Sequence, residues 1–373
     1  MNTVKGFRDY AGEEALKREE IRKILVEIFV KYGFNPAETP VIESEEFVRG
    51  DNTNDEAVSD IFKLKDKGKR KLALRYELTF PLKRLMKNQK LPYRRYQIGP
   101  VFRDEPIQGN RSRQFISCDV DVVGSTVKDE AEILATAKSI LDKLKIENII
   151  FINNRKLMNE VLEDNGIKKN KEQVLREIDK YDKLPEKEIR ASLKKLKAEN
   201  VLDSIKKGEK YFSQFDSYKE VISLMDYCKN YGVKVLFSPT IVRGLSYYNG
   251  TVFEIKSNIK ETIFGGGAYI FNEVQCVGYG VSIERLSMVA KFKTQGEKYL
   301  VVSLEQDKQA IKIAEKLRKK GKVVSIYYGK PSKALQYANS YDIDNVIFVG
   351  EKEIKSKKFK VKDMKSGKES YLK

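Results

Sequence analysis

The chain of 373 residues contains no histidine, no tryptophan and only three cysteines. Without an imidazole it cannot build a Ser-His-Asp triad, a Cys-His pair or a histidine-ligated metal site. Any catalysis must therefore use arginines, carboxylates, backbone groups or a metal ion that arrives with the substrate. Cys118, Cys228 and Cys276 lie far apart and form no Cys-x-x-Cys pair, so neither a zinc knuckle nor a disulfide framework is indicated.

Long apolar segments are also missing. No apolar run approaches the length of a membrane span, and the first residues, MNTVKGFRDY, lack the apolar core of a signal peptide. We therefore expect a cytoplasmic protein with reduced cysteines. Neither GxGxxG nor a P-loop sequence occurs, so a bound nucleotide would be held neither by a Rossmann turn nor by a P-loop.

Positive charge is in excess. Lys and Arg together number 72, against 54 Asp and Glu, which gives a formal net charge of +18. Such an excess attracts polyanions, and nucleic acid is the first candidate partner. A lysine-rich composition without functional meaning is the alternative, because lysine outnumbers arginine throughout the chain.

The spacing of apolar residues predicts a β-rich domain in the first part of the chain. Residues 12–32 have helical spacing, whereas residues 94–102 and 115–123 alternate in the manner of antiparallel strands. Residues 155–230 are strongly helical and charged, which indicates a helical insertion in that domain.

The pattern changes after a plausible linker at residues 293–298. Beyond it, the strand-like runs YLVVSL, VVSIYY and NVIFVG alternate with helical segments, which is typical of a small α/β domain with a mostly parallel sheet. We therefore predict an α+β domain with an antiparallel sheet over residues 1–292, including the insertion, and a small α/β domain over residues 298–373.

Fixed positive charge is concentrated at the tip of the predicted hairpin. The stretch FRDEPIQGNRSRQF carries Arg103, Arg111 and Arg113 around an acidic pair and a Pro-Gly-Asn break. A guanidinium binds phosphate oxygens in a bidentate manner and does not lose its proton. A single arginine there would be interpreted as a solvated charge, but three of them, together with the motifs below, favour a phosphate site.

Two further motifs place isolated arginines beside glycines. RGLSYYNGTVFE begins with Arg243, and GYGVSIERL ends with Glu284 and Arg285 at the start of a helix. Between them, IFGGGAYIF has three consecutive glycines in a strand pattern, which marks a bulge or a close approach of the backbone to another group. Taken singly, the first motif is also compatible with tyrosines that pack in a core, and the last with a surface ion pair.

Over nearly the whole chain, these motifs resemble those of class II aminoacyl-tRNA synthetases and, within that class, of histidyl-tRNA synthetases. FNPAETPVIES, with Pro40, is similar to motif 1 of the dimer interface. FRDE with RSRQF resembles motif 2, and GYGVSIERL resembles motif 3. RGLSYYNGTVFE and LRYELT are similar to the two histidine-specific signatures, and VKGFRDY resembles the opening segment. The C-terminal part resembles the anticodon-binding domain of the family.

The resemblance implies an enzyme that activates histidine with ATP and Mg²⁺ to histidyl-adenylate and transfers the histidyl group to tRNA(His). Arg103 would grip the α-phosphate, Arg285 would hold the γ-phosphate end, and Arg243 would stand near the α-phosphate; these three are the implied catalytic residues. No metal site made of protein side chains is expected. The implied ATP site consists of Arg103, Glu105, Arg111, Arg113 and Arg285.

The resemblance also implies a histidine pocket. Glu77 and Thr79 would receive the α-ammonium group, and Asp121 and Tyr248 would hydrogen-bond the imidazole. A site that pairs with both ring nitrogens rejects analogues that lack them, because its buried polar groups would be left unpaired. The whole implied set is Glu77, Leu78, Thr79, Arg103, Ser117, Asp121, Arg243, Tyr247 and Tyr248.

Four positions depart from the family pattern. They are Ser117 in place of a glutamine, Ser246 in place of the aspartate of RGLDYY, and Ala268 and Ile270 in place of the arginine and aspartate of GGGRYD. These departures favour an alternative, a non-catalytic paralogue such as the regulatory subunit of ATP phosphoribosyltransferase or a tRNA-sensing pseudo-enzyme. The retained motif arginines and the C-terminal domain favour the enzyme.

The expected partners are histidine, tRNA(His) and a second copy of the chain in a homodimer. A generic basic RNA-binding protein would explain the charge but not the spaced arginine motifs. Lysines supply salt-sensitive contacts to phosphates, although a solvated face of a strand or hairpin explains them equally well. The candidates near the C-terminus are Lys355, Lys357, Lys358, Lys360 and Lys362.

Overall fold

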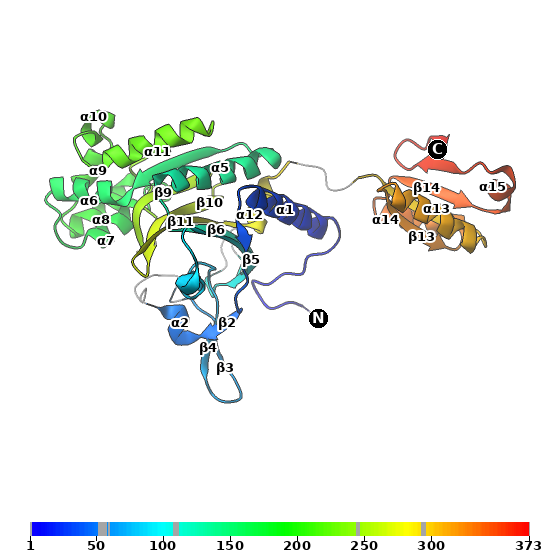
Figure 1. Ribbon diagram of the computed structural model, residues 1–373, viewed down its shortest axis with the longest axis horizontal. Helices are drawn as coiled ribbons and strands as arrows, with labels where there is room; N and C mark the ends of the chain where they lie inside the picture. Colours follow the sequence, from blue (N-terminus) through cyan, green and yellow to red (C-terminus); the bar gives the residue numbers. More distant parts are fainter. Residues whose placement is uncertain are drawn as a thin grey trace. The chain divides into compact units, whose positions relative to one another are not determined.

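The computed structural model describes residues 2–50, 58, 60–106, 112–243, 247–291 and 296–372. The chain divides into two compact units, residues 1–292 and residues 293–373. Figure 1 shows the helices and strands of both units.

An eight-stranded sheet forms the frame of the first unit (Figure 1). From one edge to the other it consists of β1 (Asn35–Pro36), β5 (Tyr93–Phe102), β6 (Gln114–Val123), β11 (Val274–Ser282), β10 (Phe264–Phe271), β9 (Tyr248–Lys256), β7 (Ile149–Asn154) and β8 (Leu236–Phe237). The two short edge strands pair in parallel with their neighbours, and every other pairing is antiparallel. The predicted antiparallel sheet is therefore confirmed.

Alternation along β6 separates the two faces of this sheet. Cys118 and Val120 are fully buried in the main core, and their neighbours Asp119 and Asp121 must point to the other face because side chains alternate along a strand. Helices cover the core face, and their buried residues join the same apolar cluster. These helices are α1 (Gly12–Lys31), α5 (Val127–Lys143), α11 (Tyr218–Asn230) and α12 (Ile283–Val289). The polar face is left for a functional site.

The ends of two of these helices follow from their sequences. α1 ends just before Gly33, whose φ of 76° is the left-handed conformation that terminates helices and that glycine adopts at little cost. α5 begins with a capping box, in which Thr126 and Asp129 satisfy each other's backbone N–H groups.

The segment predicted to be helical, residues 155–230, is helical in the structure. Its helices are α6 (Arg155–Asp164), α7 (Lys171–Ile178), α8 (Glu186–Lys195), α9 (Val201–Ile205), α10 (Glu209–Phe212) and α11. Most of them share an apolar cluster of their own, which includes Leu162, Leu175 and Leu193. This separate core makes the segment a packed subdomain.

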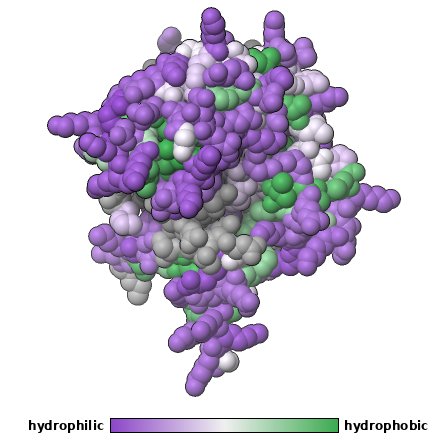
Figure 2. Space-filling view, turned by 90° about the vertical axis from the view of Figure 1, so that its left-hand side faces the viewer, coloured by the Kyte–Doolittle hydropathy of each residue, from purple (hydrophilic) through white to green (hydrophobic). Residues whose placement is uncertain are grey.

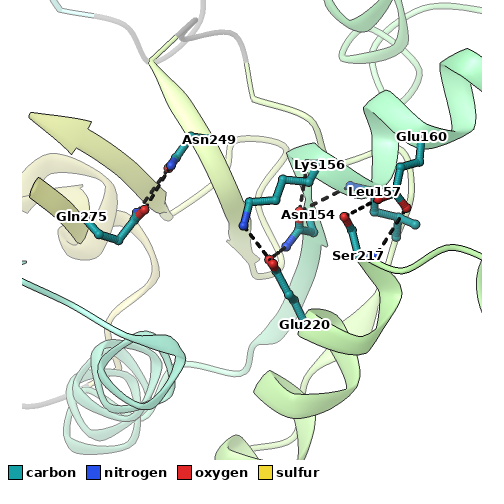
Figure 3. Close-up of polar contacts among 8 residues, drawn as sticks. All are labelled: Asn154, Lys156, Leu157, Glu160, Ser217, Glu220, Asn249 and Gln275. Atoms are coloured by element: carbon teal, nitrogen blue, oxygen red, sulfur yellow. Dashed lines mark hydrogen bonds and ion pairs between the residues drawn. The ribbon is translucent and has the colours of Figure 1, made fainter. Parts of the chain in front are cut away.

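Polar contacts connect the first and last helices of this segment to strand β7 (Figure 3). Asn154 caps α6 by accepting the backbone N–H of Lys156, and its amide donates to Glu220 at 2.8 Å. Glu220 in turn accepts a hydrogen bond from the Lys156 ammonium, and the hydroxyl of Ser217 donates to Glu160 at 2.6 Å. Both ends of the insertion therefore depend on the same strand, β7.

A small antiparallel sheet lies beside the large one in the first unit. Its strands, in order, are β2 (Ile42–Ser44), β4 (Lys71–Leu74) and β3 (Lys63–Lys65). The short helices α2 (Glu45–Arg49) and α4 (Leu82–Leu85) and a 3₁₀ helix (Met86–Asn88) accompany it.

The second unit is a five-stranded sheet with helices on both faces. Its strands, in order, are β13 (Val323–Tyr328), β12 (Lys298–Ser303), β14 (Asn345–Val349), β15 (Lys360–Asp363) and β16 (Glu369–Tyr371), of which the first three are parallel. The helices are α13 (Asp307–Lys319), α14 (Pro331–Ser340) and α15 (Glu351–Ser356). Leu300 and Val301 of β12 belong to separate apolar clusters, so both faces are covered. The predicted α/β class is confirmed.

The surface is largely polar. Figure 2 shows hydrophilic side chains over most of one face of the molecule, with hydrophobic side chains in scattered groups. In the described part of the chain, no helix combines the length and the apolar character that crossing a membrane requires.

Glu130 is a buried carboxyl group on α5, and it makes the stability of the fold depend on pH. Burial raises the pKa of Glu130 to about 7, while a hydrogen bond from Thr251 opposes the shift and the charge of Glu220 adds to it. A raised carboxyl pKa stabilises the folded state only while the group is protonated. This contribution should be complete below about pH 4.5, the ordinary value for a glutamate, and should be lost as the pH rises through about 7.

The substitution Glu130→Gln should remove this dependence. The variant's free energy of unfolding minus that of the wild type should increase by about 2–3 kcal/mol as the pH rises from roughly 5 to 8. Urea unfolding at both pH values measures the difference, with Glu188→Gln on the exposed side of α8 as the control. If the wild type and Glu130→Gln had the same pH dependence, the buried carboxyl would not be its source.

Candidate active site

A cavity of about 250 Å³ opens on the polar face of the large sheet. Side chains of β6, β10 and β11 line it, together with residues from the segments that precede and follow these strands. Its ionisable lining residues in the described part of the chain are Glu77, Arg103, Glu105, Asp119, Asp121, Arg243, Tyr247, Tyr248, Glu261, Tyr269, Tyr279, Glu284 and Arg285.

Three arginines that are far apart in the sequence meet in this cavity. Arg103 follows β5, Arg243 precedes β9, and Arg285 lies in the first turn of α12. The structure thus brings together the three guanidinium groups that the sequence analysis singled out. Such a cluster fits an anionic ligand with several charged oxygens, because a guanidinium stays protonated in proteins.

Arg243 is held from several sides. Its Nη1 lies 2.9 Å from Oε1 of Glu254, and its guanidinium packs against Gly265, where an added Cβ would be only 2.3 Å from Nη1. Although burial lowers it, the neighbouring Tyr248 and Glu254 keep the pKa of Arg243 above its ordinary value. Its φ of 58° is rare for a residue with a side chain. The glycine run in β10 thus accommodates a fixed positive charge.

Backbone groups orient the other two arginines. Arg285 donates from Nη1 to the carbonyl of Thr262 at 2.7 Å. Arg103 donates from Nε to the carbonyl of Tyr76 at 3.2 Å, and its guanidinium lies 5.3 Å from the centre of the Phe115 ring. Protein groups therefore orient the guanidinium groups, as the stabilisation of a developing charge requires.

Of the other residues predicted for an ATP site that the structure describes, only Glu105 lines the cavity. Arg113 is directed elsewhere: its backbone N–H donates to the carbonyl of Gly6 at 2.9 Å, and its guanidinium pairs with Asp104 at 3.2 Å. The Arg113 side chain packs so closely on Gly6 that an added Cβ there would be 2.8 Å away. The opening segment VKGFRDY thus supports the base of the hairpin. Arg111 lies outside the described residues.

The Glu-Leu-Thr segment contributes only its first and third residues to the cavity. Glu77 and Thr79 line it, whereas Leu78 is fully buried and does not. The carbonyl of Leu78 instead accepts a hydrogen bond from Arg95 at 2.9 Å. The predicted role of Leu78 in histidine binding stays a prediction, and its side chain does not line the cavity.

Asp121 already has protein partners at the deep end of the cavity. Nη2 of Arg95, its cross-strand neighbour in β5, lies 2.7 Å from its Oδ2, and the hydroxyl of Tyr269 donates to its Oδ1. The ring of Tyr247 packs against those of Tyr248 and Tyr269, with centroids 4.7 and 5.6 Å apart. An imidazole at Asp121 would have to share its carboxylate with two protein groups.

The sequence analysis missed Arg95, Asp119 and Tyr269. Strand parity could have identified Asp119, because Ser117 and Asp121 on the same face require Asp119 to lie there too. The pairing of Arg95 with Asp121 depends on the cross-strand register, which no local pattern in the sequence reveals. Tyr269 lies in the glycine-rich strand, and no local pattern in the sequence marks it as a partner of Asp121.

Comparisons with known proteins agree with this geometry. The family model of histidyl-tRNA synthetase matches residues 6–286, and that of an anticodon-binding domain matches residues 295–373. Histidine–tRNA ligase 1 of Bacillus cereus is 32% identical, over 99% of this chain and 96% of its own length. The histidine–tRNA ligase of Clostridium acetobutylicum is 33% identical, over 98% and 96%.

A solved structure shares the fold. The crystal structure of histidyl-tRNA synthetase from Nostoc superposes with a TM-score of 0.85 at 23% identity, and the match covers 100% of this chain and 96% of that one. Together with the family models and the curated relatives, this shows that the chain belongs to the histidyl-tRNA synthetase family.

Proposed function

We propose that this chain is a histidine–tRNA ligase, which activates histidine with ATP and Mg²⁺ and transfers the histidyl group to tRNA(His). The observation that carries the proposal is the convergence of Arg103, Arg243 and Arg285 on one cavity whose remaining lining includes carboxylates and tyrosines. The curated relatives, which match the full chain, bear the name of this activity.

In the first step, a carboxylate oxygen of histidine attacks the α-phosphorus of ATP, and pyrophosphate leaves with the electrons of the broken P–O bond. Negative charge gathers on the phosphoryl oxygens during the attack. Arg103 and Arg243 would stabilise that charge, and Arg285 would hold the far end of the triphosphate. Mg²⁺ enters with ATP as part of the substrate. In the second step, a ribose hydroxyl of the tRNA attacks the acyl carbon, and AMP leaves.

The alternative, a non-catalytic paralogue, rests on four departures from the family pattern. Ser117 is the only one of them that lines the cavity among the described residues. Ala268 is buried beside Gly250, and the side chain of Ile270 is 48% exposed. Ser246 lies outside the described residues. The departures that can be placed do not remove any of Arg103, Arg243 and Arg285 from the cavity, which favours the enzyme.

ATP–pyrophosphate exchange with each amino acid in turn tests the proposal. The assay follows the first step alone, so it needs no tRNA. Exchange that depends on histidine is the expected result. A lack of exchange with every amino acid would overturn the proposal and favour the paralogue.

The substitution Gly265→Ala should slow this exchange without unfolding the domain. The new Cβ would lie 2.3–2.6 Å from the guanidinium atoms of Arg243, which form the far end of a flexible side chain and can move away. A misplacement of about 1 Å can cost on the order of 100-fold in rate. Exchange rates and thermal unfolding should be compared with those of Gly208→Ala, where an added Cβ meets nothing within 4 Å. A wild-type rate in Gly265→Ala would argue against the role of Arg243.

The proposed partners include the tRNA and a second copy of the chain. The lysines exposed on and around α15 and β15 can contact a phosphate backbone; they are Lys355, Lys357, Lys358 and Lys360.

The proposed homodimer rests on the motif 1 resemblance, and sedimentation equilibrium tests it. The three cysteines are free and buried, which supports a cytoplasmic location with a reducing environment.

A further inference from the structure

Asp119 is a buried carboxylate that lines the cavity, and in the described part of the chain no lysine or arginine lies within ion-pair distance of it. Asp119 is only 5% exposed to solvent. The hydroxyl of Ser117 donates to Oδ1 at 2.5 Å, and the hydroxyl of Thr79 lies 3.5 Å from Oδ2. Two hydroxyls therefore satisfy its hydrogen bonding, whereas Arg95 and Arg103 act on its charge only from beyond ion-pair distance.

A buried carboxylate without a counterion is unfavourable. Burial accordingly raises the pKa of Asp119 to about 6. The contrast with its neighbour on the same face is direct, because Asp121 has the guanidinium of Arg95 at 2.7 Å. What Asp119 lacks is a cation, and the cavity that it faces can deliver one with a ligand.

The position of Asp119 along β6 indicates which ligand group this is. Across the β6–β11 pairing, Asp121 lies opposite Gly278 and Asp119 opposite Gly280, one step nearer to α12 and Arg285. From the arginines inward, the order is therefore Asp119 and then Asp121. An amino acid whose carboxylate reacts at the arginine end meets these residues with its α-ammonium first and its side chain second.

We propose that Asp119 is a substrate-binding residue that binds the α-ammonium group of the amino-acid substrate. This inference rests on the proposed function. Ser117 acts as a positioning residue, since its hydroxyl holds the carboxylate, and Gly280 keeps the space beside it open: an added Cβ there would be 3.2 Å from Oδ1. The serine that replaces the family's glutamine thereby acquires a role.

The substitution Asp119→Asn tests the proposal in the full-length chain. It preserves the shape and the hydrogen bond from Ser117 but removes the charge. The KM for histidine in ATP–pyrophosphate exchange should rise about 10- to 100-fold, while the KM for ATP stays unchanged. Ser117→Ala should raise the KM for histidine by a smaller factor and provides the test if Asp119→Asn does not fold. Asp142→Asn, which is exposed on α5, is the control and should change neither constant.

Two analogues separate the α-ammonium from the imidazole. Histidinol keeps both groups but lacks the carboxylate, whereas imidazole propionic acid lacks the amine. Calorimetry should show that Asp119→Asn weakens the binding of histidinol and leaves the binding of imidazole propionic acid unchanged. Equal weakening of both analogues, or an unchanged KM for histidine, would overturn the proposal. A wild-type chain without histidine-dependent exchange would instead overturn the proposed function, so the two failures are distinct.

Discussion

Replacing Arg103 with alanine should slow histidine-dependent ATP–pyrophosphate exchange by a factor on the order of 100 to 1,000, or about 3–4 kcal/mol of barrier. The guanidinium lines the cavity and would carry charge that the transition state needs more than the ground state does. The folded state depends on it little, because the side chain is 34% exposed and its contact with the backbone is a hydrogen bond to Tyr76. Thermal unfolding should therefore stay close to that of the wild type.

Two companion variants sharpen this test. Arg103→Lys keeps the charge but loses the planar fork that grips two phosphate oxygens at once, so it should restore only part of the rate. Arg70→Ala removes an arginine that is 79% exposed and pairs with Asp66 outside the cavity, and it should exchange at the wild-type rate. If Arg103→Ala retained full activity, or lost activity only in proportion to a loss of folded protein, the role of Arg103 would be contradicted.

The fold was predictable where one physical signal dominated. β6 alternates apolar and acidic residues from Cys118 to Val122, and α1 has both an apolar stripe and a terminating glycine at Gly33. Local patterns contain less information about which distant strands pair. The insertion of β11 between β6 and β10 and the parallel edge strands result from packing across the whole domain, and a single sequence does not specify them.

The candidate site divides in the same way. Arg103, Arg243 and Arg285 could be predicted, because each stands in a motif with glycines or acids at fixed spacing. Leu78 was included for its place in a motif, and the sequence alone does not reveal that its side chain is buried outside the cavity lining. Arg95 resembles an ordinary charged strand residue in the sequence, and only the register that places it opposite Asp121 makes it a buried partner.

That buried pair supports the second large prediction. The side chains of Arg95 and Asp121 are 0% and 3% exposed, and 2.7 Å separate Nη2 from Oδ2. Arg95→Met should lower the free energy of unfolding by about 3–5 kcal/mol, because Asp121 would keep a buried charge without a counterion. Chemical denaturation at neutral pH measures the loss. The exposed ion pairs of Arg190 with Glu186 and Asp203 are the control, and Arg190→Met should lower the free energy of unfolding far less.

A double variant separates the cost of an unpaired charge from the loss of packing. Arg95→Met combined with Asp121→Leu removes both charges, and such replacements of buried pairs are often nearly neutral for stability. The double variant should therefore be more stable than Arg95→Met alone, and the coupling energy from the cycle should be large. Acid should also reduce the loss in Arg95→Met, since burial already raises the pKa of Asp121 and a protonated carboxyl group needs no counterion. A loss that is the same at acid and neutral pH, with no recovery in the double variant, would mean that Arg95 stabilises the sheet through packing and its hydrogen bond to Leu78 alone.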